Sequence, residues 1–118
     1  MRQEPGLRNA IMTKILYSIE ALQDLEQLGD YITDTLKTPI AALNTVTKIQ
    51  DSIDILADFP RSGAPLSSIA EMDTDYRFLV CGNYLAFYRA EEGLVYIDRI
   101  LYGRRDYLSI LGLATEEK

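Results

Sequence analysis

Apolar positions recur every three or four residues in the first half of the chain, a spacing typical of amphipathic helices. The first series, whose acidic residues fall mostly on a separate wet side, is Ala21, Leu25, Leu28, Ile32 and Leu36. The second begins after the helix-start signal Thr38-Pro39, ends at Phe59-Pro60, and contains Ala42, Val46, Ile49, Ile53 and Leu56. Because only a few residues separate the two series, they predict an antiparallel helical hairpin.

In the last third of the chain the pattern changes to strands. Residues 75–106 contain three runs rich in Tyr, Phe, Val, Ile and Leu, separated only by Gly82-Asn83 and Glu91-Glu92-Gly93. Turns this short leave no room for a crossover, so the runs predict a three-stranded antiparallel meander. The β-prone run at 14–19 predicts a further strand, residues 60–73 predict a loop, and the tail after Asp106 predicts a short helix.

This order of elements predicts an α+β fold: an N-terminal strand, an antiparallel helical hairpin, a three-stranded antiparallel meander and a short C-terminal helix. We expect a flexible tail at residues 1–13, a single domain at 14–112 and a polar tail at 113–118. Translation could begin at Met1 or at Met12.

The sheet is expected to leave one face for a protein partner, because a single helical hairpin covers only one of two apolar faces. Alternation along the last strand puts Tyr96, Ile100 and Tyr102 on one face, and Val95, Ile97 and Leu101 on the other. The candidate partner-binding residues are Tyr84, Tyr88, Tyr96, Ile100 and Tyr102.

Composition excludes several kinds of chemistry. The chain has no histidine and a single cysteine, Cys81, which excludes zinc sites built on Cys and His as well as histidine bases. We expect no cofactor and no metal. No apolar run approaches the roughly 18 residues of a membrane span, and the N-terminus lacks the apolar segment of a signal peptide, so we expect a cytoplasmic protein.

The meander is locally basic, although the net charge of the chain is −6. From residue 76 to residue 105 there are five arginines and three acidic residues. This balance favours an anionic or acidic partner, whereas the acidity of the whole chain argues against a general nucleic-acid binder. Arg77 and Arg99 could instead be structural, paired with Asp98 or Asp106, and Arg89 could be solvated. Arg104 and Arg105, which follow Gly103, are the strongest functional candidates.

The ordered strings Asp75-Tyr-Arg-Phe-Leu-Val, Gly82-Asn-Tyr-Leu-Ala-Phe-Tyr-Arg and Val95-Tyr-Ile-Asp-Arg-Ile-Leu-Tyr-Gly-Arg-Arg-Asp resemble the C-terminal half of the RelE/ParE superfamily. Members of this superfamily are toxins of bacterial type II toxin–antitoxin systems, including those that stabilise plasmids. The resemblance extends back to about Ile15 and implies the same α+β fold. It also implies a cognate antitoxin that covers the toxin in a hetero-oligomer.

One branch of the superfamily, the RelE-like toxins, resembles ribosome-dependent endonucleases that cut mRNA. On that reading the partners are the ribosome and mRNA, and the catalytic candidates are Arg77, Arg99, Arg104 and Arg105. The RelE-like pattern, however, has an arginine after the Tyr that opens the middle strand and a tyrosine in the tail. This chain has Leu85 and Leu111 there, and it has no lysine between Lys48 and Lys118.

The ParE-like toxins, which resemble inhibitors of DNA gyrase and are not nucleases, match more closely. Their pattern has an early arginine in the first meander strand, a middle strand ending in Tyr-Arg, and a last strand ending in Gly, Arg, any residue and Asp. The implied target-binding residues are Arg77, Arg89, Arg104, Arg105 and Asp106. The sequence therefore favours a toxin that inhibits growth by binding gyrase. An mRNA endonuclease and a non-toxic partner-binding domain are the alternatives.

Overall fold

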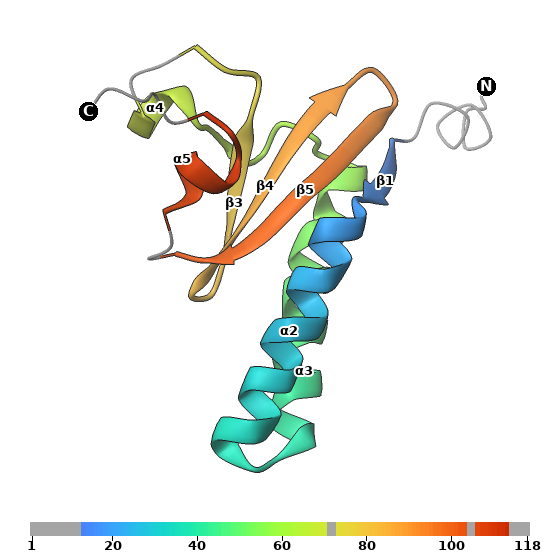
Figure 1. Ribbon diagram of the computed structural model, residues 1–118. Helices are drawn as coiled ribbons and strands as arrows, with labels where there is room; N and C mark the ends of the chain where they lie inside the picture. Colours follow the sequence, from blue (N-terminus) through green and yellow to red (C-terminus); the bar gives the residue numbers. More distant parts are fainter. Residues whose placement is uncertain (1–12, 71–72, 104–105, 114–118) are drawn as a thin grey trace, which may run out of the picture.

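The computed structural model describes residues 13–70, 73–103 and 106–113 and has the predicted α+β fold (Figure 1). The helices are α2 (Ile19–Leu36), α3 (Pro39–Asp54), which continues into a 3-10 turn (Ile55–Ala57), α4 (Ser67–Ala70) and α5 (Tyr107–Ile110). The strands are β1 (Lys14–Tyr17), β2 (Ala64–Pro65), β3 (Arg77–Cys81), β4 (Tyr84–Glu91) and β5 (Leu94–Tyr102). The helical hairpin, the meander and the short C-terminal helix are thus confirmed. The predicted tail at 1–13 falls, apart from Thr13, outside the described residues.

The five strands form one sheet in the order β1-β5-β4-β3-β2. The antiparallel meander β3-β4-β5 forms its centre, and the hairpin α2–α3 separates β3 from β1 in the chain. Strand β1 pairs in parallel with β5, from Lys14 opposite Leu94 to Tyr17 opposite Ile97. A parallel neighbour is possible because the long connection through the hairpin and the meander carries the chain back to the same edge.

The prediction of a plain loop at residues 60–73 was wrong, because β2 and α4 lie within it. Long-range contacts draw this segment onto β3. The N–H of Gly63 donates to the Tyr88 hydroxyl at 2.9 Å, and Arg77 Nη1 donates to the Gly63 carbonyl at 2.6 Å. A Cβ at Gly63 would lie 2.6 Å from the Tyr88 hydroxyl oxygen and 2.7 Å from the Phe78 carbonyl oxygen, so only glycine fits between these strands.

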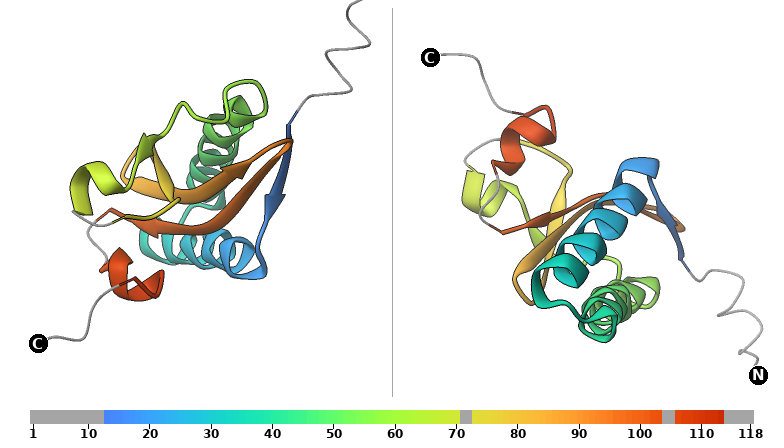
Figure 2. Two further views of the ribbon diagram at one scale, coloured as in Figure 1. Left: turned by 90° about the horizontal axis from the view of Figure 1, so that it is seen from above. Right: turned by 60° about the horizontal axis from the view of Figure 1, so that its bottom comes forward.

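Ser18 fixes the start of the helical hairpin. Its side chain accepts a hydrogen bond from the N–H of Ala21 at 2.9 Å, which caps α2. At the other end of α2, Lys37 adopts a left-handed conformation with φ of 59°, and Pro39 follows as the first residue of α3. The hairpin crosses one face of the sheet, and its far end projects beyond the sheet (Figures 1 and 2).

A β-bulge at Asp98 changes which residues of β5 face the hairpin. Phe87 pairs with Arg99 and Tyr88 pairs with Ile97, so Asp98 is the extra residue. Ile97 therefore packs toward the hairpin on one side of the bulge, and Ile100 does so on the other. The sequence predicted that Ile100 lies on the other face of the sheet from Val95 and Ile97. This prediction was wrong, because simple alternation does not anticipate a bulge.

The sheet has a core on each face. The larger core, between the sheet and the hairpin, includes buried residues of both: Ala21, Leu25, Leu28, Ile49, Ile53, Ala86, Tyr88, Val95, Ile97 and Ile100. A second cluster on the opposite face is built on Leu66, Phe87 and Leu101, with residues of α4 and α5 packed against it. The second face is thus partly covered by α4 and α5, which the sequence did not predict (Figure 2).

Candidate partner-binding site

An open cleft lies where α2 crosses the ends of β4 and β5. Its volume is about 560 Å³, and its lining residues are Asp24, Gln27, Leu28, Tyr31, Tyr84, Ile100, Leu101 and Tyr102. The α2 residues are spaced by three, one and three, which places them along a single face of the helix. Tyr84 opens β4 and lies opposite Tyr102 at the end of β5. We call this site the tyrosine cleft.

Three tyrosines, Tyr31, Tyr84 and Tyr102, provide the aromatic surface of the cleft. The rings of Tyr84 and Tyr102 meet edge to face, with centroids 5.8 Å apart, and Tyr31 and Tyr102 are 65% and 45% exposed. Burial raises the pKa of Tyr84, and the neighbouring Tyr102 and Tyr31 add to the increase. The hydroxyl of Tyr84 is therefore neutral at physiological pH. Exposed tyrosines of this kind bury a large apolar area and still offer a hydrogen bond, as at protein–protein contacts.

A second open cleft of about 630 Å³ lies on the α3 side and shares Tyr84 with the first. It reaches from Ile32 across α3 to the β3–β4 turn, and its wall includes the buried Cys81. Burial raises the pKa of the Cys81 thiol, so this cysteine is a small hydrophobic residue of the core rather than a reactive group.

Asp24 holds the wall of the tyrosine cleft in place. Its carboxylate accepts two hydrogen bonds from Arg99, both at 2.8 Å, and one from the N–H of Ile100 at 2.9 Å. Strand β1 ends at Tyr17, so within the described residues no strand pairs with this edge of β5 at Ile100, and Asp24 accepts from its N–H instead. The hydrogen bond to Asp24 also raises the pKa of Arg99. Arg99 is thus structural, but its partner is Asp24 and not Asp98 or Asp106.

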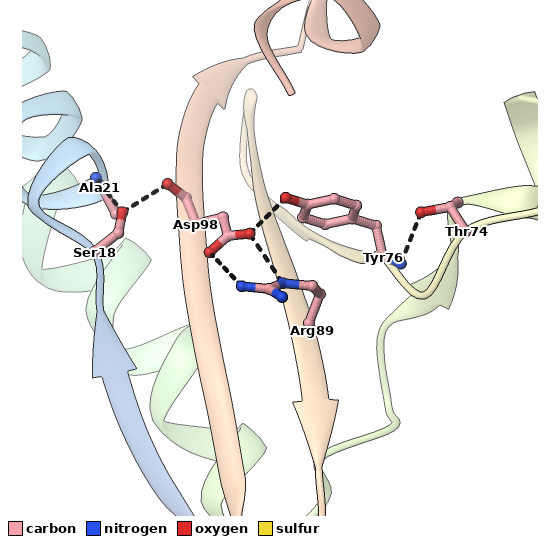
Figure 3. Close-up of polar contacts among 6 residues, drawn as sticks. All are labelled: Ser18, Ala21, Thr74, Tyr76, Arg89 and Asp98. Atoms are coloured by element: carbon pink, nitrogen blue, oxygen red, sulfur yellow. Dashed lines mark hydrogen bonds and ion pairs between the residues drawn. The ribbon is translucent and has the colours of Figure 1, made fainter. Parts of the chain in front are cut away.

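Arg89 is likewise paired rather than solvated. Its guanidinium donates to Asp98 through Nε at 3.1 Å and Nη2 at 3.4 Å, and the hydroxyl of Tyr76 donates to the same carboxylate at 2.6 Å (Figure 3). The guanidinium also lies 5.8 Å from the ring centroid of Tyr76 and 5.5 Å from that of Tyr96. The side chain of Arg89 is still 41% exposed, so it presents part of its surface on the face opposite the hairpin.

The remaining predicted target-binding residues do not form one site in the described part of the chain. Arg77 donates to the carbonyls of Arg61 and Gly63 at 3.2 and 2.6 Å, and thereby anchors β2. Asp106 caps α5 by accepting from the N–H and hydroxyl of Ser109. Arg104 and Arg105 lie outside the described residues.

Three of the five predicted partner-binding residues, Tyr84, Ile100 and Tyr102, line the tyrosine cleft together. The other two do not. Tyr88 is fully buried beneath Gly63, and Tyr96 lies beside Arg89 on the opposite face. Tyr31 was missed by the sequence-based prediction, although its position three residues after Leu28 in the amphipathic pattern places it next to the apolar face of α2.

The five-stranded sheet with a helical hairpin on one face is the fold of the small RelE/ParE-like toxins. The family described as "ParE toxin of type II toxin-antitoxin system, parDE" matches residues 15–107, and the chain belongs to this family. A chain in the solved structure of the chromosomal ParDE TA system from P. aeruginosa has the same fold, with a TM-score of 0.66. The match covers 77% of this chain and 96% of that chain at 22% sequence identity.

No protein with a curated description matches this sequence. None of the helices in the described ranges is long and apolar enough to cross a membrane. Among the same residues, no three His, Cys, Asp or Glu side chains gather in a way that could hold a metal ion.

Proposed function

We propose that this chain is a growth-inhibiting toxin that binds DNA gyrase, is not a nuclease, and is neutralised by a cognate antitoxin. The observation that supports this proposal most strongly is the second cluster. Leu85 and Leu111, which stand where a RelE-like toxin has an arginine and a tyrosine, both pack against this cluster together with Tyr107. The face that would need exposed catalytic groups is filled with apolar side chains under α5.

The described arginines also argue against RNA cleavage. Stabilising a phosphorane requires cations aimed at the reacting phosphate. Arg99 is committed to the buried carboxylate of Asp24, and Arg77 is committed to two backbone carbonyls. Without histidine in the chain, RNA cleavage would depend on such cations, and both catalytic candidates that lie among the described residues are engaged elsewhere.

We assign antitoxin binding to the tyrosine cleft and gyrase binding to Arg104 and Arg105. The cleft supplies exposed tyrosines around an apolar floor, and it ends at Tyr102. Arg104 follows Tyr102 by two residues, and two residues of chain span at most about 7 Å. An antitoxin segment seated on Tyr102 is therefore close enough to compete with the target for this end of the strand.

The test is to induce the chain in bacterial cells with and without the antitoxin encoded in the same operon. We expect growth arrest by the chain alone, loss of plasmid supercoiling, intact mRNA, and relief of all effects by the antitoxin. Arrest accompanied by ribosome-dependent mRNA cleavage, with supercoiling unchanged, would reject gyrase as the target. Unimpaired growth of cells that contain the folded protein would reject a toxic function and favour the alternative of a non-toxic partner-binding domain.

A further inference from the structure

The charged residues of α2, the helix that borders the tyrosine cleft, are all acidic. Helix α2 contains no lysine or arginine, and its charged residues are Glu20, Asp24, Glu26, Asp30 and Asp34. Asp24 is buried and paired with Arg99, whereas the other four are exposed. The net charge of the whole chain is only −6, so a large share of the acidic excess is concentrated on this one helix.

The arrangement of these charges does not favour folding of the toxin itself. Glu26, Asp30 and Asp34 are spaced by four, so like charges are neighbours along one side of the helix. Asp34 also lies in the last turn of α2, where the negative end of the helix dipole adds to the repulsion; this turn has no basic residue, and the nearest cation is Lys37 at the C-cap. A cationic partner would relieve both sources of repulsion.

Asp30 and Asp34 stand at the outer lip of the tyrosine cleft. Gln27 and Tyr31 line the cleft, and Asp30 and Asp34 follow Gln27 by three and seven residues, which places them on the adjoining side of the same helix. Tyr31 lies between them in sequence and is 65% exposed. Among the described residues that line this cleft, none is cationic. The exposed aromatic surface and the acidic row therefore meet at one edge.

We infer that the tyrosine cleft takes an apolar segment of the antitoxin that carries lysine or arginine beside its apolar residues, so that these cations face Asp30 and Asp34. This inference rests on the proposed function and adds the chemistry of the partner. The exposed tyrosines supply the apolar contact, and the acidic row supplies orientation and a fast, salt-sensitive encounter.

The test is binding of the full-length toxin to the antitoxin from the same operon, measured at two salt concentrations. We expect Asp30→Lys/Asp34→Lys to weaken binding roughly ten- to hundredfold, to reduce its salt dependence, and to raise the melting temperature of the free toxin. The matched control is Glu91→Lys/Glu92→Lys, which makes the same charge change at the exposed β4–β5 turn and should bind like the wild type. Tyr31→Ala should also weaken binding without altering the salt dependence.

Each outcome decides the inference. Equal binding by both double variants, or tighter binding by Asp30→Lys/Asp34→Lys, overturns the inference that the antitoxin segment is basic. Sedimentation measures whether the toxin associates with itself. If Asp30→Lys/Asp34→Lys abolishes self-association and leaves antitoxin binding unchanged, the cleft binds a second copy of this chain, and the inference is also overturned. Failure of the proposed function is separate, because it shows as unimpaired growth when the wild-type toxin is induced alone.

Discussion

Asp98 is the extra residue of the β5 bulge, and it bonds to three other segments of the molecule. It accepts from Arg89 of the neighbouring strand and from Tyr76, which precedes β3, while its backbone carbonyl accepts from Ser18 at 2.8 Å. The residue thus ties the entrance of α2 to the face opposite the hairpin (Figure 3). Arg89, which the sequence predicted as a target-binding residue, therefore stabilises the fold through its pair with Asp98.

The pair Asp24–Arg99 has the same structural role on the hairpin side. We expect Asp24→Ala to lower the free energy of unfolding by about 3 kcal/mol, because it leaves the Arg99 guanidinium and the Ile100 N–H without a partner. Urea denaturation measures this change, with the exposed Asp30→Ala as the control, which should stay within about 0.5 kcal/mol of the wild type. A loss for Asp24→Ala no larger than that of the control would return Arg99 to the functional candidates.

Tyr76 gives stability a dependence on alkaline pH. Burial, followed by the hydrogen bond to Asp98, raises the pKa of Tyr76 to about 12 from an ordinary value of 10.0. The folded state therefore favours the neutral phenol, so this contribution to stability is complete below pH 10 and is lost as the pH rises from about 10 to 12. Tyr17, whose pKa burial also raises to about 12, acts in the same direction.

We expect Tyr76→Phe to make the decline in stability above pH 10 less steep and to remove one late step from the tyrosinate ultraviolet titration. The unchanged step of Tyr17 is the internal control. A titration of the variant identical to that of the wild type would show that Tyr76 ionises normally and that its contact with Asp98 is absent in solution.

At the scale of elements, the junction of β1 and α2 determines how the hairpin lies on the sheet. Ser18 caps α2, donates to the carbonyl of Asp98, and its N–H donates to the Ile97 carbonyl at 2.9 Å. One short side chain therefore fixes both the start of the helix and the position of the bulge. Because the tyrosine cleft lies between this helix and this strand, its shape depends on the same junction.

We expect Ser18→Ala to destabilise the protein by about 1–2 kcal/mol, since it removes the helix cap and the bond to Asp98. Thermal unfolding should show a melting temperature lower by roughly 5–10 °C. Ser52→Ala is the matched control, because the exposed bond from the Ser52 hydroxyl to the Lys48 carbonyl lies within α3 and caps no helix. An equal effect of the two substitutions would contradict the assigned role of Ser18.

Local patterns predicted the helical hairpin and the meander because their signals are close in sequence. Helical spacing defines α2 and α3, and Gly82 and Gly93, with φ of 63° and 76°, allow the tight turns of the meander. The bulge, β2 and the Asp24–Arg99 pair were not predictable in this way. Asp24 and Arg99 are 75 residues apart, and no local pattern specifies which acidic residue of α2 meets which arginine.

At the scale of the whole molecule, charge is divided between the two layers. The hairpin carries the acidic excess on α2, whereas the described part of the meander, residues 76–103, balances Arg77, Arg89 and Arg99 against Glu91, Glu92 and Asp98. Family membership, the tyrosine cleft and the apolar second cluster together favour a toxin that acts by binding. Arg104 and Arg105, at the end of the meander, are the cations of this region that we assign to the target.

The most direct test of this account is DNA supercoiling by purified gyrase in the presence of increasing amounts of the toxin, freed of antitoxin. We predict dose-dependent inhibition that is lost in Arg104→Ala/Arg105→Ala and retained in Lys48→Ala/Arg61→Ala, a control that removes two exposed cations elsewhere. Supercoiling that proceeds unchanged at every concentration of folded wild-type toxin would contradict the account.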